Sequence, residues 1–514
     1  MKKLFTTIIA GLMISAQVMA VSVKDVCGQF DGNLNIGSQL YPNKSVYLLP
    51  GVEENTVTFV LPDFIYNNGN LGNIVLPNIP MSSSGQLTLD NATLYLDSIQ
   101  ERATITVLNG LEDGGKVYNS IVTATDAMVV LSIVAPSVSK PIFVLFVGTA
   151  AAAKNYELTN GGFEGDWTNK EPQGWHSFGT ADGLLAGFVN ENTFQFVQST
   201  VVRPGSKGKN SALLSSNILF GVAANGNCTN GRINAGSMTA DDAKGNFNYS
   251  HPDSTGFNTP FHGRPDSIVF WAKYQPADLN PANEKNKARL NAVITTNARY
   301  QDPEDTVKYG DIVLGKATIN YAATSNMGWQ RLSVPFEYVE ANKDKEPAYI
   351  LTTFSTNMVP GGGSSYSEGG IFDEKTVVDS IYLDDVEIVY KKELASFKMG
   401  ANELSFTDYV AKAEGNYCDD CAKFAAQAAG LSAQPFIAFD ATHKCIYVYV
   451  IAEDYAQSGN CNIYLVEFAD SVEPIASVVE NTFTGKRFEK IIMNGQLFIH
   501  AGDMWFNAAG VRVQ

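Results

Sequence analysis

The sequence predicts an all-β protein built from several domains, and three of its features support this. Charged residues make up only 17% of the 514 residues. Runs of alternating apolar and polar residues, such as Thr56–Leu61, recur between turn-forming residues, as half-buried strands require. Runs of Ala, Glu, Lys and Leu, which are typical of long helices, are scarce. Because one hydrophobic core rarely serves a chain of this length, we expect about three domains.

The first 20 residues have the pattern of a secretory signal peptide. Lys2 and Lys3 form a basic start, Leu4–Val18 is mostly apolar, and small residues suited to cleavage end at Ala20. No later segment approaches the roughly 20 apolar residues that a membrane span requires. We therefore expect a secreted mature chain that begins near Val21 and has no transmembrane segment. It would reside in the periplasm or on the outer cell surface of a Gram-negative bacterium.

The formal net charge of −17 limits the possible partners. Nucleic acid is disfavoured, because Lys and Arg must displace the counterions of its phosphates. An anionic membrane surface is disfavoured for the same reason. Uncharged carbohydrate and a bound cation such as calcium remain well suited. The charge therefore excludes partners more than it selects one.

Residues 21–150 predict a β-barrel. Alternating segments such as Ala103–Leu108 follow one another at short intervals, which indicates a meander that closes on itself. Three segments, Phe30–Leu34, Phe59–Phe64 and Gly72–Pro77, resemble the calycin-like (lipocalin-like) domain of secreted bacterial proteins. That resemblance implies an eight-stranded barrel, whose interior is either filled by side chains or open to one small ligand.

Residues 155–392 predict a jelly-roll β-sandwich. After an Ala-rich linker, Trp, Asn and Gly become frequent and the loops lengthen. The order of several segments resembles the carbohydrate metabolism domain family and, more broadly, the jelly-roll carbohydrate-binding modules. These segments are Asn160–Glu164, Glu171–Trp175, Asp266–Tyr274, Trp329–Phe336 and Ser380–Ile388.

Two long segments without periodicity lie inside this region, at 223–265 and 359–370. Loops of this length in a compact domain are usually functional or disordered. Their aromatic residues and one histidine could line a binding site, or the loops could be mobile surface segments without a function. These residues are Tyr249, Phe257, Phe261, His262 and Tyr366.

The remaining chain predicts a small β-domain at 393–475 and a tail at 476–514. In the domain, Ile446–Val450 reads as one of three strands, and Tyr417–Gly430 predicts a short helix. The domain resembles the small immunoglobulin-like repeats that follow sugar-related domains. The tail resembles a sorting signal of type IX secretion, which implies delivery to the cell surface.

Four of the six cysteines lie close together near the end of the chain. We expect structural disulfides among them, with metal binding and redox catalysis as alternatives, and the sequence does not define which cysteines pair. Redox catalysis is disfavoured because the two aspartates of the Cys-x-x-Cys motif oppose formation of a thiolate. The four are Cys418, Cys421, Cys445 and Cys461.

A calcium site is predicted from the resemblance to jelly-roll modules. In those modules, acidic side chains near the first and last strands often hold a structural calcium ion. Glu164, Asp384 and Asp385 take those places here, and calcium requires six to eight oxygen ligands. The alternative is that the aspartates cap strand ends or pair with lysines such as Lys391.

Aromatic side chains are the candidate sugar contacts, because flat rings pack against the C–H faces of pyranoses. Trp167, Trp271 and Tyr366 are the candidates, although Trp271 lies in a predicted strand and could equally be a core residue. Trp175 is expected to be a core residue.

No catalytic constellation is evident in the sequence. Glycoside hydrolysis needs two carboxylates across the scissile bond, and adjacent residues of a strand, such as Asp384 and Asp385, point to opposite faces. Nucleophile-elbow, zinc-protease and phosphate-loop motifs are missing. We therefore expect non-catalytic carbohydrate binding through the jelly-roll domain. The alternatives are a glycoside-active enzyme that uses the jelly-roll cleft, and a lipocalin-type carrier or inhibitor of small apolar ligands.

Overall fold

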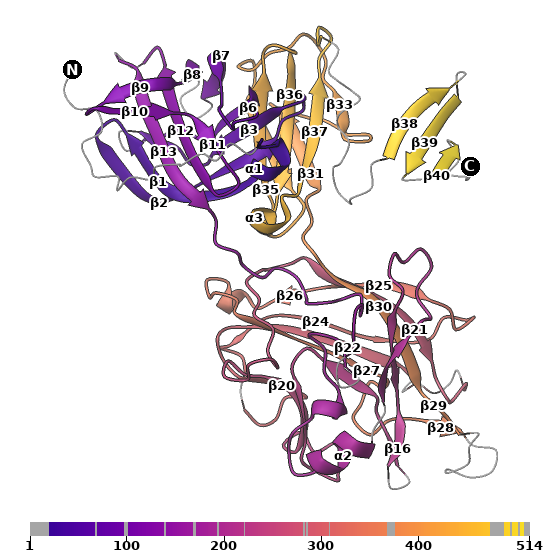
Figure 1. Cartoon of the computed structure of the whole chain (residues 1–514). Helices are drawn as coiled ribbons and strands as arrows, with labels where there is room; N and C mark the ends of the chain where they lie inside the picture. The colour runs from indigo at the N-terminus through magenta and orange to yellow at the C-terminus, as the bar shows by residue number, and fades with distance from the viewer. Residues whose placement is uncertain are drawn as a thin grey trace. The chain divides into compact units, whose positions relative to one another are not determined.

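The computed structural model confirms an all-β fold, with about 50% strand and 5% helix, and it divides into two compact units (Figure 1). Unit 1 combines Met1–Ala153 with Lys392–Gln514, and unit 2 is Lys154–Lys391. Among the described residues, no helix is long and apolar enough to cross a membrane. The predicted signal peptide lies outside these residues apart from Ala20. The structure describes residues 20–66, 69–96, 101–137, 140–167, 171–192, 195–219, 222–280, 283, 286–307, 309–366, 376–472, 488–493, 496–501 and 504–507.

The N-terminal part of unit 1 is a nearly closed, barrel-like sheet. Its strands follow the order β6-β3-β2-β1-β13-β12-β8-β7, and a bridge between Met81 and Leu87 brings the two ends together. The strands are β1 (Gly28–Ile36), β2 (Gln39–Pro50), β3 (Thr56–Leu61), β6 (Ile74–Pro80), β7 (Leu89–Leu96), β8 (Glu101–Val107), β12 (Asp126–Val134) and β13 (Ile142–Ala150). Smaller elements decorate it: α1 (Val23–Val26), the hairpins β4 (Ile65–Tyr66) with β5 (Gly69–Asn70) and β9 (Asn109–Asp113) with β10 (Lys116–Asn119), and β11 (Ile121–Val122) beside β12.

Side-chain alternation along β3 explains how the barrel core forms. Val57, Phe59 and Leu61 belong to the large apolar cluster inside the barrel. Val60 points to the opposite face, because successive side chains of a strand alternate, yet it is also fully buried. β2 and β6 show the same two-sided burial at Leu49 and Val75. The outer face of β6-β3-β2 must therefore be covered by a second layer.

The chain after residue 391 supplies that layer. A four-stranded sheet in the order β33-β37-β36-β35 packs on the barrel, and a three-stranded sheet, β32-β31-β34, packs on its other face. Tyr449 faces the barrel, where Thr58 Oγ1 donates to its hydroxyl at 2.9 Å, and Val448 faces the three-stranded sheet. The segment 392–472 therefore shares a core with the barrel. Its elements are β31 (Leu394–Met399), β32 (Asn402–Glu403), β33 (Val410–Lys412), β34 (Phe424–Ala428), β35 (Gln434–Asp440), β36 (Cys445–Ile451), α3 (Tyr455–Ser458) and β37 (Cys461–Glu467).

The helix predicted over Tyr417–Gly430 is wrong. Phe424–Ala428 is the strand β34, which pairs antiparallel with β31. Phe424 is buried in the cluster between the two sheets. Alanine has the highest intrinsic helix propensity, but propensity is a weak determinant of structure, and strand pairing with burial of Phe424 overrides it.

The predicted disulfides are not found. All six cysteines lie within the described residues, and all six are free thiols. The register of β36 and β37 pairs Cys445 with Glu467 and Ile451 with Cys461, so these two cysteines lie at opposite ends of the strand pair. Cys421 Sγ lies 3.7 Å from the carbonyl oxygen of Cys418. Desolvation, with smaller effects of neighbouring groups, raises the pKa of Cys418 to about 11. The thiolate that redox catalysis needs is therefore disfavoured.

The last strands form a separate small antiparallel sheet in the order β38-β39-β40. They are Phe488–Met493, Gln496–Ala501 and Met504–Asn507. Residues 476–487, 494–495, 502–503 and 508–514 of the predicted sorting tail lie outside the described residues, so the sorting role stays a prediction.

Unit 2 contains a β-sandwich of two five-stranded sheets. Phe270 of one sheet and Phe354 of the other meet in the core with ring centroids 5.1 Å apart, and Trp175 lies 5.9 Å from Phe354, as expected of a core residue. The first sheet runs β14 (Phe196–Ser199), β15 (Ser211–Ser215), β30 (Ser380–Val389), β21 (Ser267–Gln275) and β25 (Gln330–Pro335). The second runs β18 (Asn227–Thr229), β27 (Tyr349–Ser355), β22 (Ala288–Thr295), β24 (Val313–Tyr321) and β26 (Glu337–Tyr338).

A third, smaller sheet covers part of the second sheet's outer face. Tyr300 of the small sheet packs with Tyr309 against Val293 and Leu351. The small sheet is β19 (Arg232–Ala235), β20 (Asn246–Ser250) and β23 (Tyr300–Asp302). The remaining elements are η1 (Phe178–Thr180), α2 (Ala186–Asn192), η2 (Glu340–Asn342), and the hairpins β16 (Asn217–Leu219) with β17 (Val222–Ala224) and β28 (Ser365–Tyr366) with β29 (Val377–Val378).

Candidate functional site

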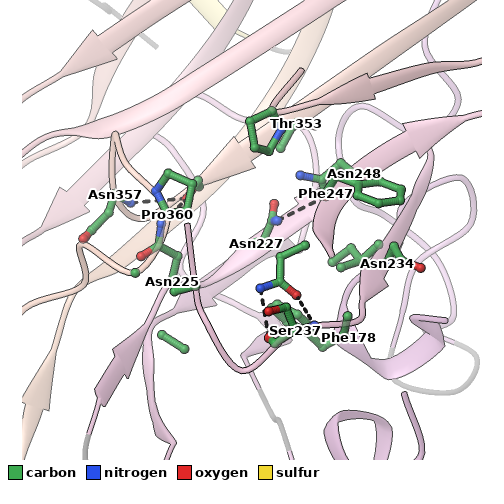
Figure 2. Close-up of a pocket in the computed structure, with 18 of the residues that line it drawn as sticks. Phe178, Asn225, Asn227, Asn234, Ser237, Phe247, Asn248, Thr353, Asn357 and Pro360 are labelled. Atoms are coloured by element: carbon green, nitrogen blue, oxygen red, sulfur yellow. Dashed lines mark hydrogen bonds between the residues drawn. The ribbon is translucent and has the colours of Figure 1, made fainter. Parts of the chain in front are cut away.

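A cavity of about 370 Å³ lies over the outer face of the second sheet of unit 2 (Figure 2). Three residues on neighbouring strands form part of the cavity floor. The register aligns Asn227 with Ser355 and Ser355 with Arg289, so all three point to the same face. Phe354, which precedes Ser355 in β27, points into the sandwich core. Strand alternation alone therefore separates the polar floor from the apolar core.

The cavity walls come from several segments distant in sequence. β19, β20, η1 and α2 contribute, together with residues 237–240 and 357–361. The two aperiodic segments predicted at 223–265 and 359–370 thus both supply lining residues. In Figure 2, Asn225 and Asn357 lie on one side of the cavity, Phe247 and Asn248 on the other, with Asn227 between them.

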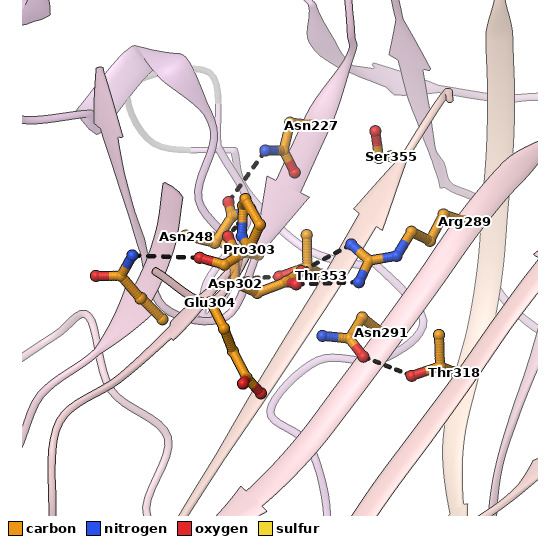
Figure 3. A network of polar contacts seen from close by, with 12 residues as sticks. Asn227, Asn248, Arg289, Asn291, Asp302, Pro303, Glu304, Thr318, Thr353 and Ser355 are labelled. Carbon is orange, nitrogen blue, oxygen red and sulfur yellow. Dashed lines mark hydrogen bonds and ion pairs between the residues drawn. The ribbon is translucent and has the colours of Figure 1, made fainter. Parts of the chain in front are cut away.

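An ion pair between the half-buried Arg289 and the buried Asp302 lines the cavity (Figure 3). Arg289 Nη1 and Nη2 donate to the two oxygens of Asp302 at 2.9 and 3.0 Å. Asp302 is only 3% exposed. Asn248 Nδ2 donates to the Asp302 carbonyl oxygen at 3.4 Å, and Asn227 Nδ2 donates to Asn248 Oδ1 at 3.1 Å. This chain of contacts fixes the orientation of both amides, because a carbonyl oxygen can only accept.

Two further asparagines are held in the same way. Asn357 Nδ2 donates to the buried Asp379 carboxylate at 2.7 Å and to the Thr356 carbonyl oxygen at 2.9 Å. Asn225 Nδ2 donates to the Val359 carbonyl oxygen at 2.8 Å. Because these partners cannot donate, the side-chain oxygen of each asparagine must face away from them.

Three amide oxygens of the lining are buried and lack a donor among the described residues. They are the Oδ1 atoms of Asn225, Asn227 and Asn357. Asn357 is 3% exposed. An unsatisfied buried acceptor destabilises a protein by about 1–3 kcal/mol, so a ligand or water that brings donors is favoured here. The three asparagines line the cavity, and these oxygens are closed to solvent in this structure.

Two of the predicted sugar-contacting aromatics, Trp167 and Trp271, are not part of this cavity. Trp167 Nε1 donates to the Phe163 carbonyl oxygen at 3.1 Å, and its ring packs 5.0 Å from that of Phe196. The Trp271 ring lies 5.2 Å from the Arg203 guanidinium. Both tryptophans belong with the first sheet, whereas the cavity lies over the second. The side chain of Tyr366 lies outside the described residues.

Most oxygens of the three predicted calcium ligands already have nitrogen partners, although Asp384 Oδ1 is buried without one among the described residues. Glu164 accepts hydrogen bonds from Lys209 N, Asn210 N and Asn210 Nδ2 at 2.8 to 3.2 Å. Arg203 forms an ion pair with Asp385, and its backbone N–H donates to Asp384 Oδ2 at 2.9 Å. Calcium requires six to eight oxygen ligands, and these contacts engage most of the carboxylate oxygens that would supply them. Calcium binding stays a prediction without support from the contacts.

Asp384 gives unit 2 a pH dependence that a substitution can test. Burial, with a smaller contribution from Asp385, raises its pKa from 3.8 to about 6. Folding therefore takes up a proton between those values, and this group makes the fold less stable as pH rises from about 4 to 6. We expect Asp384→Asn to raise the Tm at pH 7 by a few degrees and to flatten the fall in Tm across that window, as measured by calorimetry. The exposed control Asp241→Asn should change neither quantity. An unchanged Tm profile for Asp384→Asn would contradict the argument.

The residues of the cavity were not identifiable individually from the sequence. Asn225, Asn227, Arg289, Asp302 and Asn357 form no motif, because tertiary structure alone brings them together. The one sequence signal was the pair of long aperiodic segments. They predicted which region contains the cavity, but they did not predict which of its residues line it.

The fold and site define a β-protein of two compact units, with an asparagine-lined cavity on a β-sandwich. No protein-family model matches the sequence, and no curated protein matches it. Among solved structures, the chain is similar to the glycoside hydrolase domain of Endo-D from Streptococcus pneumoniae R6, with 11% identity and a TM-score of 0.17 over 50% of this chain and 34% of that one. It thus spans about a third of that structure's length.

A second similar structure comes from Bacteroides fragilis and bears the provisional description of an outer membrane protein. It shares 10% identity and a TM-score of 0.16, over 65% of this chain and 98% of that one. TM-scores this low carry no argument about the site, so the function rests on the contacts of the cavity.

Proposed function

We propose that unit 2 binds carbohydrate in this cavity without transforming it. The observation that carries the proposal is the set of three buried amide oxygens without donors, on Asn225, Asn227 and Asn357. Sugar hydroxyl groups are donors that can satisfy several acceptors at once. Each buried acceptor that gains a donor recovers a penalty of about 1–3 kcal/mol, which favours a polyhydroxylated ligand over an apolar one.

The rest of the lining suits the other half of a sugar's chemistry. Phe178, Phe247 and Ile233 present apolar surface beside the polar floor. The C–H-rich faces of a pyranose pack against such surfaces, aromatic ones above all. A few placed polar groups in a mostly apolar cavity are the usual composition of a small-molecule site.

The number of carboxylates in the cavity favours carbohydrate binding over glycoside hydrolysis. Among the described lining residues, Asp302 is the single carboxylate. Both of its oxygens are engaged by Arg289. Glycoside hydrolysis by the usual route requires a pair of carboxylates about 5–10 Å apart in one groove. The proposal is therefore a binding module, and the glycoside-active alternative would need a second carboxylate at this site.

The test is a glycan-array screen with the full chain, followed by titration calorimetry of the glycans that bind. We expect saturable binding that Asn227→Ala weakens by about tenfold, which equals 1.4 kcal/mol and is within the range for a lost hydrogen bond at a buried acceptor. Asn155→Ala, at an exposed asparagine outside the cavity, is the matched control and should bind like the wild type. Silence across the array, or binding that is indifferent to Asn227→Ala, would refute the assignment.

The proposal also includes the setting that the sequence predicts. We propose that the chain is exported by residues 1–20 and acts in the periplasm or on the cell surface, where glycans are accessible. The calycin-like identity of the barrel and the sorting role of 476–514 belong to the same proposal. The apolar cluster inside the barrel favours the filled form of the barrel over a ligand-carrying one.

A further inference from the structure

The cavity has an apolar part that is distinct from its polar floor. Val189, Ile233 and Ala235 belong to one buried apolar cluster, and Phe178 and Leu185 pack against it. All five also line the cavity. α2 and β19 therefore present a continuous apolar surface, whereas the unsatisfied oxygens come from the segments around β18 and the end of β27.

This apolar surface continues into solvent at the mouth of the cavity. Phe188 is 41% exposed, Met238 65% and Val359 38%, and all three line the same cavity. Exposed apolar side chains that line one cavity are suited to contact an apolar group of a ligand. Its continuity with a cavity that contains buried acceptors indicates one ligand that uses both surfaces.

The cavity carries no net charge. Among its described lining residues, Arg289 is the one cation and Asp302 the one anion, and they neutralise each other through two hydrogen bonds. A charged ligand would leave water without gaining an opposite charge, which disfavours it. The ligand that fits is therefore uncharged.

We propose that the ligand is an uncharged glycoside whose hydroxyl groups donate to the buried asparagine oxygens and whose apolar substituent lies against Phe188 and Met238. This inference rests on the proposed carbohydrate binding and goes further, because it specifies an apolar aglycone or acyl group next to the sugar. A free sugar would satisfy the acceptors and leave the apolar mouth exposed to water. An apolar substituent covers that mouth and gains from its burial.

The test compares methyl and phenyl β-D-glycosides of glucose, galactose and N-acetylglucosamine by titration calorimetry with the full chain. We expect the phenyl glycoside of the preferred sugar to bind at least tenfold more tightly than its methyl counterpart. Phe188→Ala and Met238→Ala should reduce this ratio to threefold or less, because they weaken binding of the phenyl glycoside more than binding of the methyl glycoside. Both side chains are exposed, so the variants are expected to fold. Leu279→Ala, at an exposed leucine outside the cavity, is the control.

The outcomes separate the two proposals. Equal affinity for the methyl and phenyl glycosides would overturn this inference and leave carbohydrate binding intact. A preference for phenyl that survives both substitutions would overturn the placement of the substituent. If no glycoside and no glycan of the array binds, the proposed function itself fails.

Discussion

Replacement of Arg289 by alanine is expected to destabilise unit 2 by about 3–5 kcal/mol. The guanidinium makes two hydrogen bonds to Asp302, whose side chain is almost wholly buried. Without Arg289, the Asp302 side chain, which is 5% exposed, loses the cation that neutralises it. Removal of one partner of a buried pair leaves that charge uncompensated, which is far more damaging than removal of both.

Tryptophan fluorescence during urea unfolding provides the measurement. Four of the five tryptophans lie in unit 2, at positions 167, 175, 271 and 329. The double variant Arg289→Ala/Asp302→Ala should lose less stability than the two single variants together, because no unpaired charge remains. Arg331→Ala, at an exposed arginine, should change stability by less than about 1 kcal/mol. A loss below about 1 kcal/mol for Arg289→Ala would show that the pair is not insulated from solvent.

Strand positions were predictable wherever the chain alternates strictly. Thr56–Leu61 was predicted as a strand and is β3, and Ile446–Val450 lies inside β36. The same pattern held a hint that the prediction did not use. Val60 is apolar and lies on the outer face of the barrel, which an isolated barrel would expose to solvent. In the structure, β36 and its neighbours cover that face. An apolar residue on the face expected to be polar is the local sign that a second layer covers the barrel sheet there.

The cavity could not be predicted in the same way, because its residues are ordinary in type and distant in sequence. Asn227, Arg289 and Ser355 become neighbours only through the pairing of β18, β27 and β22. Asparagine is common in turns, so its appearance in a loop-rich segment carries little information. The orphan oxygens are visible only once the partners of each amide nitrogen are known. Strand register determines which polar side chains meet in the cavity. The sequence pattern indicated only the long loops that form the rest of its lining.

Replacement of Tyr449 by alanine is expected to destabilise the barrel and the C-terminal sheets together, by about 3–5 kcal/mol. Tyr449 is fully buried between β36 and the outer face of the barrel. Thr58 Oγ1 donates to its hydroxyl at 2.9 Å, and nearby Tyr455 donates to the Leu48 carbonyl oxygen at 2.7 Å. Because the two chain segments of unit 1 contribute to one core, a cavity in that core should weaken both.

Hydrogen exchange followed by mass spectrometry distinguishes a shared core from two independent ones. In Tyr449→Ala, peptides from β2 and β3 should lose protection to the same extent as peptides from β35 to β37, and alkylation of the buried Cys445 and Cys461 should accelerate in parallel. Tyr449→Phe keeps the ring and removes one hydrogen bond, so its loss should be near 1 kcal/mol. If the barrel peptides keep wild-type protection while β36 loses it, the barrel is stable alone. The return of the chain to the barrel would then be a docking contact between two cores, whereas parallel loss means that neither segment of unit 1 is stable without the other.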